Sequence, residues 1–230
     1  AKYAQKEHAK VVLTSIPYDG TSTWGKGADK GYKAFMNASE NMELYDIETH
    51  SEPYLEGVYL DEPLDVKKCS PEEMVEMVYK RVQKQLKLKK LLTYFGGEHS
   101  ISIGVLRAFA KVHKKLTVVQ LDAHTDLRQE YHGTKFNHAC ALAEAQRYTN
   151  LIQVGIRSMD ICEKPYLQKE KVYFAHQIMD NDYWMEEAIK KMTNTVYITL
   201  DLDVFDSALM PSTGTPEPGG MQWYQVLQFL

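Results

Sequence analysis

The chain has 230 residues, a formal net charge of −4 and 44% hydrophobic residues. This length suits one large domain or two small ones, and the hydrophobic content is enough for a substantial buried core. The acidic balance leaves no basic footprint of the kind that nucleic-acid-binding proteins carry, and it agrees with a cationic substrate.

The cysteines are Cys69, Cys140 and Cys162, an odd set without a Cys-x-x-Cys pair. A disulfide framework or a thiolate zinc site is therefore not expected, and a reducing, cytoplasmic setting follows as the default. The first ten residues are polar and basic, without the apolar stretch of a signal peptide. No apolar run approaches membrane-spanning length, so we expect no membrane partner.

Strand-like and helix-like segments alternate along the chain. Apolar runs predict strands at 10–17, 43–47, 151–157 and 171–175, and three more that begin at Leu91, Val118 and Thr195. Helices are predicted at 31–42, from Ser70 onward, and at 101–112, 137–147 and 180–192. The Gly- and Thr-rich segment 18–27 lacks phosphate-loop spacing and is interpreted as an ordinary or substrate-rim loop, and 51–66 as a surface excursion.

This alternation predicts a parallel, doubly wound α/β sheet with helices on both faces. The clearest helix start is Ser70-Pro71-Glu72-Glu73, which combines a capping residue, a proline and acidic residues. One helical face then carries an apolar stripe: Met74, Val75, Val78, Val82 and Leu86. No linker splits the chain, so residues 1–230 are expected to form a single domain.

Three of the predicted strands end in residues that bind metals. Asp122, His124 and Asp126 follow the run at Val118, and alternation by two places them on one side if the chain stays extended. His99 follows the run at Leu91, and the run at Thr195 ends in Asp201-Leu202-Asp203. Each motif alone also fits a solvated strand end. Together they predict one site, because ligands bind at the carboxyl ends of parallel strands.

The six candidate ligands comprise four carboxylates and two imidazoles. An oxygen-rich set favours Mn²⁺ or Mg²⁺, while Zn²⁺, Fe²⁺ and Co²⁺ remain compatible. Six ligands are too many for one four-coordinate zinc, so a pair of metals about 3.5–4 Å apart fits better. Two divalent ions cancel four aspartates, and a bridging hydroxide leaves one negative charge that suits a singly cationic electrophile rather than a phosphate ester.

His138 follows the metal motif at the start of the predicted helix 137–147. A histidine in this position is often structural or a helix cap. The functional alternative is a proton shuttle, because an ordinary imidazole pKa of about 6.5 allows proton exchange at neutral pH.

The three motifs together resemble those of the ureohydrolases, the arginase and agmatinase family. The resemblance runs from about Val11 to Met221 and rests on Gly96-Gly97-Glu98-His99-Ser100, Asp122-Ala123-His124-Thr125-Asp126 and Asp201-Leu202-Asp203. The runs Leu127-Arg128 to Phe136-Asn137-His138-Ala139-Cys140 and Gly214-Thr215-Pro216-Glu217-Pro218-Gly219-Gly220 look like the agmatinase branch.

The resemblance implies a three-layer α/β/α fold with a binuclear manganese centre, two Mn²⁺ per subunit. One ion would take His99, Asp122, Asp126 and Asp201, and the other Asp122, His124, Asp201 and Asp203. A bridging hydroxide, steadied by Asp126, would attack the guanidinium carbon to give urea and an amine. His138 would shuttle protons and contact substrate, and Asp160 matches a substrate-side aspartate.

The resemblance also implies a small cationic guanidino substrate and a homo-oligomer, trimeric or hexameric. Arginases grip the α-carboxylate of arginine with residues after the second motif, and this chain has Leu127-Arg128 there. We therefore expect an agmatinase that yields putrescine and urea in polyamine metabolism. Alternatives are another guanidino substrate such as guanidinobutyrate or arginine, a non-catalytic metal-binding member, and a mononuclear zinc deacetylase of related fold.

Two segments beside the site depart from the family pattern. Asp206-Ser207 stands where the family has Asp-Pro, and Pro211-Ser212-Thr213-Gly214 where it has Pro-Gly-x-Gly. Family members also continue beyond the equivalent of Leu230 with a segment that includes a late glutamate for the guanidinium. The single ureohydrolase domain is thus expected to lack the family's C-terminal segment.

Overall fold

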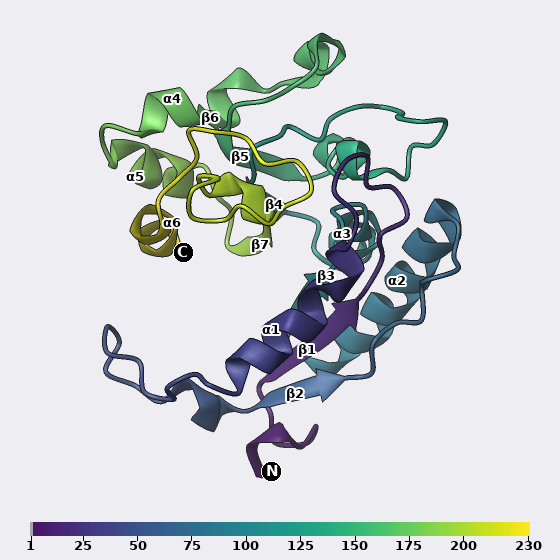
Figure 1. Ribbon diagram of the computed structural model, residues 1–230, viewed down its shortest axis with the longest axis vertical. Helices are drawn as coiled ribbons and strands as arrows, with labels where there is room; N and C mark the ends of the chain where they lie inside the picture. The colour runs from purple at the N-terminus through teal and green to yellow at the C-terminus, as the bar shows by residue number, and fades with distance from the viewer. Residues whose placement is uncertain (1) are drawn as a thin grey trace.

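Parallel β-sheets form the centre of the protein, which is represented by a computed structural model describing residues 2–230 (Figure 1). The strands are β1 (Val11–Ile16), β2 (Val58–Asp61), β3 (Leu91–Gly96), β4 (Leu116–Leu121), β5 (Asn150–Ile156), β6 (Val172–Phe174) and β7 (Thr195–Leu200). The α-helices are α1 (Gly31–Ser39), α2 (Pro71–Gln85), α3 (Ile101–Val112), α4 (Ala175–Ile178), α5 (Tyr183–Lys190) and α6 (Trp223–Phe229).

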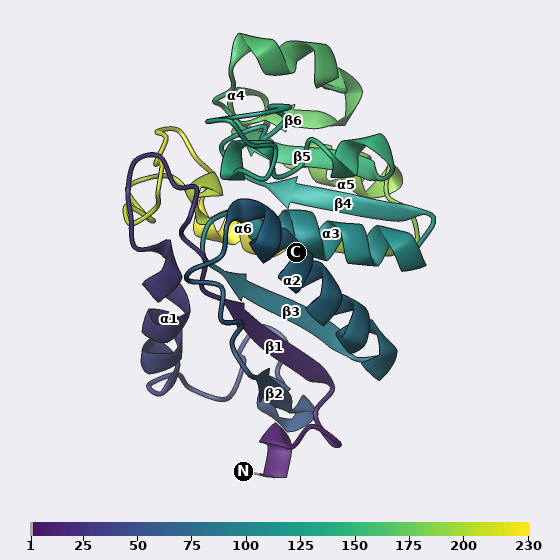
Figure 2. The same cartoon turned by 90° about the vertical axis from the view of Figure 1, so that its right-hand side faces the viewer.

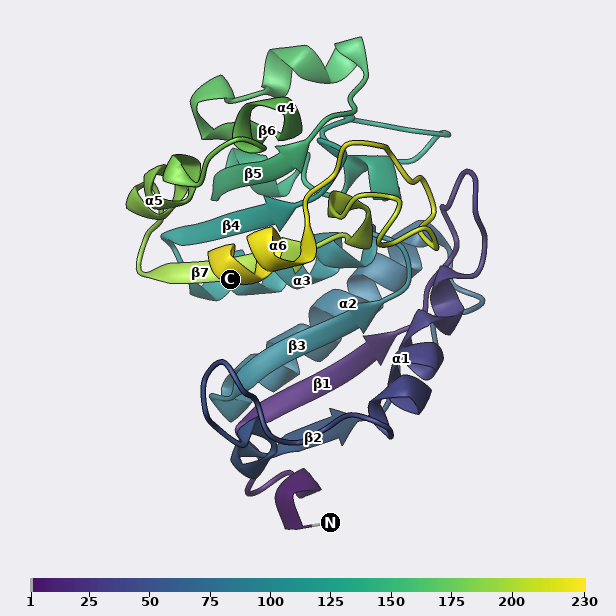
Figure 3. The ribbon, with the colours of Figure 1, turned by 60° about the vertical axis from the view of Figure 1, so that its left-hand side comes forward.

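All of these strands pair in parallel, as the sequence predicts, but their hydrogen bonds divide them into two sheets. The first sheet has the order β2-β1-β3 and the second the order β6-β5-β4-β7. Strands β3 and β7 are therefore sheet edges within the described residues. Three alternate side chains of β7, Val196, Ile198 and Leu200, are each more than 40% exposed. Figure 3 shows β1, β3 and β4 pointing in the same direction, so their carboxyl ends lie on one side of the molecule.

Helices cover both faces of the sheets, which confirms the predicted layering (Figure 2). Every residue of β4 is buried. Leu116 and Val118 pack with Leu106 of α3 on one face. Val119 and Leu121 face the other way and pack with Trp184 of α5. A parallel strand buried on both faces is mostly apolar, which is why this run is recognised as a strand in the sequence although it includes Thr117 and Gln120.

The prediction for residues 43–66 is wrong in its details. No strand forms at 43–47; Asp46 makes only an isolated bridge to Ser51, and its carboxylate accepts hydrogen bonds from the amides of Glu48 and Thr49. This local turn chemistry replaces the ladder bonds of a strand. Strand β2 instead lies within the segment expected to be a surface excursion.

The helix predicted at 137–147 is also absent. Two 3-10 turns, His138–Cys140 and Ala145–Arg147, occupy this segment. The amide of Leu142 donates to the Asp126 carbonyl, and the Ala139 carbonyl accepts from Arg128. These bonds tie the segment to the loop after β4 and take backbone groups that a continuous helix would need.

The other helices lie where the sequence places them, with shifts at the ends. The 101–112 helix has the predicted bounds, while α1 stops at Ser39 and α5 starts at Tyr183. Ser70 and Glu73 form the predicted capping box at the start of α2. Within residues 2–230, no helix combines the length and the apolar character needed to cross a membrane.

We expect Gly104→Ala to destabilise the protein, because Gly104 of α3 lies directly against α2. A Cβ at this position would lie 2.6 Å from the Val75 carbonyl oxygen and 2.9 Å from Val78 Cβ. Such overpacking between helices costs about 1–3 kcal/mol of unfolding free energy. Gly31→Ala is the matched control, because its Cβ would meet only Phe95 at 3.7 Å. Urea denaturation of both variants measures the difference, and equal effects would contradict this account of the helix contact.

Candidate metal centre

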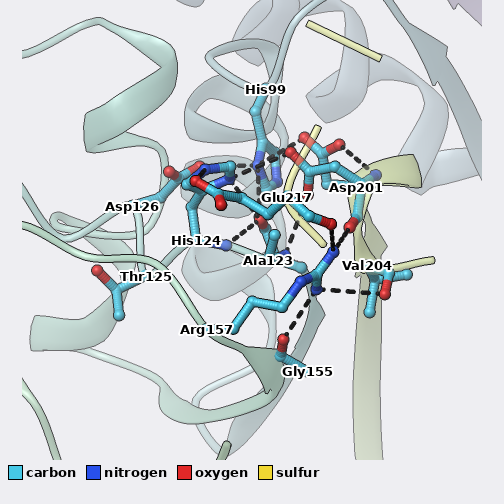
Figure 4. Close-up of polar contacts among 12 residues, drawn as sticks. His99, Ala123, His124, Thr125, Asp126, Gly155, Arg157, Asp201, Val204 and Glu217 are labelled. Carbon is cyan, nitrogen blue, oxygen red and sulfur yellow. Dashed lines mark hydrogen bonds and ion pairs between the residues drawn. The ribbon is translucent and has the colours of Figure 1, made fainter. Parts of the chain in front are cut away.

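The carboxyl ends of β3, β4 and β7 bring the predicted ligands to one place, although β3 belongs to a different sheet (Figure 3). His99 lies in the loop between β3 and α3, and the other side chains follow β4 or β7. The structure gathers all of the predicted ligand side chains: His99, Asp122, His124, Asp126, Asp201 and Asp203 (Figure 4). The side chain of Asp122 is 1% exposed, and that of Asp201 is 30% exposed.

The two imidazoles each face a separate group of carboxylates. His99 Nδ1 lies 2.8 Å from Asp126, 3.1 Å from Asp122 and 3.4 Å from Asp201. His124 Nδ1 lies 3.1 Å from Asp203 and 3.6 Å from Asp122. His99 with Asp122 and Asp126, and His124 with Asp122 and Asp203, each have ligand atoms within 4.8 Å of one another. The two groups share Asp122, which is the arrangement that a pair of neighbouring cations requires.

The orientation of each histidine leaves its Nδ1 atom directed into the cluster. His99 Nε2 lies 2.9 Å from Thr199 Oγ, and His124 Nε2 lies 3.7 Å from Glu217. His99 Nδ1 is buried and makes no hydrogen bond of normal geometry within residues 2–230, despite the carboxylates around it. A buried imidazole nitrogen that faces carboxylates in this way can coordinate a metal, while the other ring nitrogen is oriented by a hydroxyl or a carboxylate.

Asp122, the carboxylate that both groups share, has a lowered pKa, whereas the pKa values of the other carboxylates are raised. The burial of Asp122 opposes ionisation, but the neighbouring imidazoles of His124 and His99 hold its pKa below the usual range. The same contacts act on the imidazoles. Burial works to lower the pKa of His124, but Asp122 and Asp203 raise it to about 11, and the pKa of His99 is likewise raised by Asp122 and Asp126.

The remaining carboxylates lack enough positive charge around them. Burial and the neighbouring charge of Asp122 raise the pKa of Asp126 to about 7. Burial and the charges of Asp203 and Asp122 raise the pKa of Asp201 to about 7, and burial with Asp122 raises that of Asp203 to about 6. Two imidazolium groups therefore do not compensate four buried carboxylates, and additional cations would fit this donor set.

The backbone after β4 follows the predicted alternation only part of the way. A parallel bridge between His124 and Ser158 keeps the chain extended through His124. Asp126 then adopts a left-handed conformation with φ of 52°. Buried Glu163 stabilises this turn by accepting hydrogen bonds from Thr125 Oγ and the Leu127 amide. Asp126 thus reaches the cluster through a turn, not through continued extension.

Several residues that support the cluster were not identified from the sequence. Gln120 donates to Asp122 at 2.8 Å and is held in turn by Gln153. Glu163 contacts Thr125, 38 residues earlier, and Thr199 precedes Asp201 but contacts His99, 100 residues earlier, so no local pattern marks either contact. Glu217 lies in the run that carries the agmatinase resemblance, but its approach to His124 depends on how the segment after β7 folds back.

His138 lies beside the loop between β1 and α1. Its backbone amide donates to Thr21 Oγ at 3.0 Å, and its Nδ1 atom lies 3.3 Å from the same oxygen. Burial lowers the pKa of His138 to about 4, and the positive charges of His99, His124 and Lys26 add to this effect. The imidazole of His138 is therefore neutral at the pH where the cluster would be loaded.

Asp160 lies outside the cluster. It caps the 3-10 turn Ile161–Tyr166, and its carboxylate is 3.1 Å from the guanidinium of Arg128. The Arg128 guanidinium in turn stacks over Tyr131, 4.5 Å from the ring centroid. Hydrogen bonding to the Cys162 amide, together with Arg128, keeps the pKa of Asp160 below its usual value. It is therefore an anionic residue next to the loop that carries Asp126.

Comparison with known proteins places this arrangement in a family. The "N(1)-aminopropylagmatine ureohydrolase" of Synechocystis is 35% identical, over 96% of this chain and 76% of its own length. A protein of the same name from Thermus thermophilus is 32% identical, over 100% of this chain and 79% of its own length. The crystal structure of the agmatine ureohydrolase of Thermoplasma volcanium superposes with a TM-score of 0.88 at 30% identity, covering 98% of this chain and 78% of that one.

The structural similarity confirms the predicted arginase-like α/β fold, and the sequence similarity confirms the resemblance drawn from the three motifs. The names of these relatives describe ureohydrolases of N1-aminopropylagmatine or of agmatine. The Arginase family model matches residues 9–230, and the chain therefore belongs to the arginase family of hydrolases.

Proposed function

We propose that this protein is a ureohydrolase for a linear guanidino amine, agmatine or its N1-aminopropyl derivative. The reaction consumes one water and the guanidinium group and yields urea and an amine, putrescine in the case of agmatine. The observation that carries the proposal is the buried cluster of four carboxylates and two imidazoles at the carboxyl ends of β3, β4 and β7. The names of the relatives support the substrate class.

We propose that the cluster holds two Mn²⁺ ions. His99, Asp122, Asp126 and Asp201 would hold one ion, and Asp122, His124, Asp201 and Asp203 the other, so that Asp122 and Asp201 are shared. The mostly oxygen donor set favours manganese over zinc. When bound, such a pair supplies a water with a pKa lowered to about 7 and compensates the charge of the carboxylates.

The side chains of the protein would orient the reactants and move the protons. Asp126 would accept a hydrogen bond from the attacking water and so direct it at the guanidinium carbon. His138 would protonate the amine nitrogen as its bond to that carbon breaks. Gln120 and Thr199 keep Asp122 and His99 in place and so preserve the geometry of the cluster.

The substrate assignment depends on the loop after Asp126. The motif by which arginases grip the α-carboxylate of arginine is not present at Leu127-Arg128. Glu217 and Asp160 instead provide negative charge for a cationic tail, although Asp160 would have to share or release Arg128. Of the two substrates, the N1-aminopropyl derivative has the larger number of amines, and the relatives at 35% and 32% identity carry its name.

We expect urea release from agmatine or N1-aminopropylagmatine to exceed that from arginine and guanidinobutyrate. A site without a carboxylate partner gains nothing from a substrate carboxylate and must desolvate it. A panel of the four compounds, assayed for urea with the manganese-loaded protein, gives the order of kcat/KM. Faster turnover of arginine or guanidinobutyrate would overturn the substrate assignment, and manganese binding without urea from any compound would favour the non-catalytic alternative.

Asp201→Asn should lose metal and activity together. The amide keeps the shape of the side chain but removes the negative charge that both ions would share, so we expect kcat/KM to fall by at least about 100-fold. Metal content by mass spectrometry and urea release are measured on the same preparation. Asp180→Asn, an exposed change of the same kind, is the control. Full turnover by Asp201→Asn would refute the ligand assignment.

Manganese affinity should weaken as the pH falls from 8 to 6. Asp126 and Asp201, with their pKa raised to about 7, take up protons in this range, and His124 must also lose its proton to bind metal. Each displaced proton changes the apparent affinity about tenfold per pH unit. Calorimetric titration in buffers of different ionisation enthalpy counts the released protons. An affinity that does not vary with pH would show that metal binding displaces no protons from these groups.

A further inference from the structure

Glu98 is a buried carboxylate that the proposed chemistry does not use. It lies next to His99 but accepts hydrogen bonds from four uncharged donors: the Thr21 amide at 3.1 Å, Thr21 Oγ at 2.8 Å, the Ser100 amide at 2.8 Å and Ser100 Oγ at 2.9 Å. These four donors occupy most of the acceptor positions of the carboxylate. Its role must therefore lie in what it does to its donors.

The Thr21 hydroxyl connects Glu98 to His138. Thr21 Oγ has one proton to donate and can accept two, and it has three partners: Glu98, the His138 amide at 3.0 Å and His138 Nδ1 at 3.3 Å. The amide can only donate. A hydroxyl proton bonds more strongly to a charged carboxylate than to a neutral ring nitrogen, and the shorter distance to Glu98 agrees with this. Thr21 Oγ therefore has only lone pairs to offer His138, and its partner Nδ1 must be the donor.

We propose that Glu98 and Thr21 are positioning residues that hold His138 in the tautomer with its proton on Nδ1. Nε2 is then the atom that exchanges protons with the reactants. It takes up a proton from water to form the imidazolium and passes that proton to the amine nitrogen as the carbon–nitrogen bond breaks, while the other ring proton stays on Nδ1, hydrogen-bonded to Thr21 Oγ. This inference rests on the proposed function, in which His138 protonates the leaving amine.

The tautomer can be measured without turnover. In protein labelled with ¹⁵N-histidine and loaded with diamagnetic Mg²⁺, we expect His138 to show a protonated Nδ1 and an unprotonated Nε2. Thr21→Val keeps the side-chain shape but removes the hydroxyl, and should shift His138 towards the Nε2-protonated tautomer. Thr21→Ser keeps the hydroxyl and should preserve the wild-type signal. A wild-type His138 with its proton on Nε2 would overturn the proposal, whether or not the variants fold.

The contribution of Glu98 is tested by Glu98→Ala. Losing the carboxylate that accepts from Thr21 Oγ frees the hydroxyl proton for His138 Nδ1 and should move the ring towards the Nε2-protonated tautomer. An unchanged His138 tautomer in this variant would remove Glu98 from the proposal. Metal content is measured in parallel, because His99 is the next residue.

The kinetic test uses two leaving groups with the manganese-loaded protein. We expect Thr21→Val to lower kcat for agmatine by about 10- to 100-fold with little change in KM, because a misplaced proton impairs general acid catalysis. An aryl guanidine releases a less basic amine whose departure depends less on protonation of its nitrogen, so its kcat should fall less. Equal losses on both substrates, or none on either, would contradict the proposal. Absence of urea from wild-type protein would instead refute the proposed function.

Discussion

The crowding of four carboxylates in a buried space is the constraint on which the rest of the site depends. A single buried carboxylate is costly, and Asp122, Asp126, Asp201 and Asp203 lie around two imidazoles that cannot compensate all of them. The protein reduces the cost for Asp122 with Gln120, His99 and His124. The raised pKa values of the other three show that the compensation is incomplete, and this leaves a place for divalent cations.

The surrounding fold holds these charges in position. β4 is buried on both faces, and its pairing with β5 and β7 fixes the position of Asp122 relative to the ends of those strands. Arg157 donates to the carbonyl groups of Asp203 and Glu217, which attaches the segment after β7 to the end of β5. Glu163 fixes the turn at Asp126. The polar contacts outside the cluster therefore determine its geometry as much as the ligands themselves do.

The sequence predicted the parts of this site that depend on local pattern. The apolar runs before His99, Asp122 and Asp201 identified the strands, and the rule that ligands collect at carboxyl strand ends brought the six side chains together. It could not predict the 3-10 turns at 137–147, because the backbone bonds that replace the helix come from a distant loop. Glu163 and Thr199 were missed for the same reason. Their roles arise from contacts with residues far away in sequence.

The ligands of the centre come from two groups of strands that, within residues 2–230, are not hydrogen-bonded to one another. His99 comes from the sheet of β3, and its partners Asp122 and Asp201 come from the sheet of β4 and β7, which in the described chain shares no ladder hydrogen bond with the first. Helix α3 packs against both halves, and the ligand cluster spans the boundary between them. A cation shared by His99 and the aspartates would therefore link side chains that come from both groups of strands.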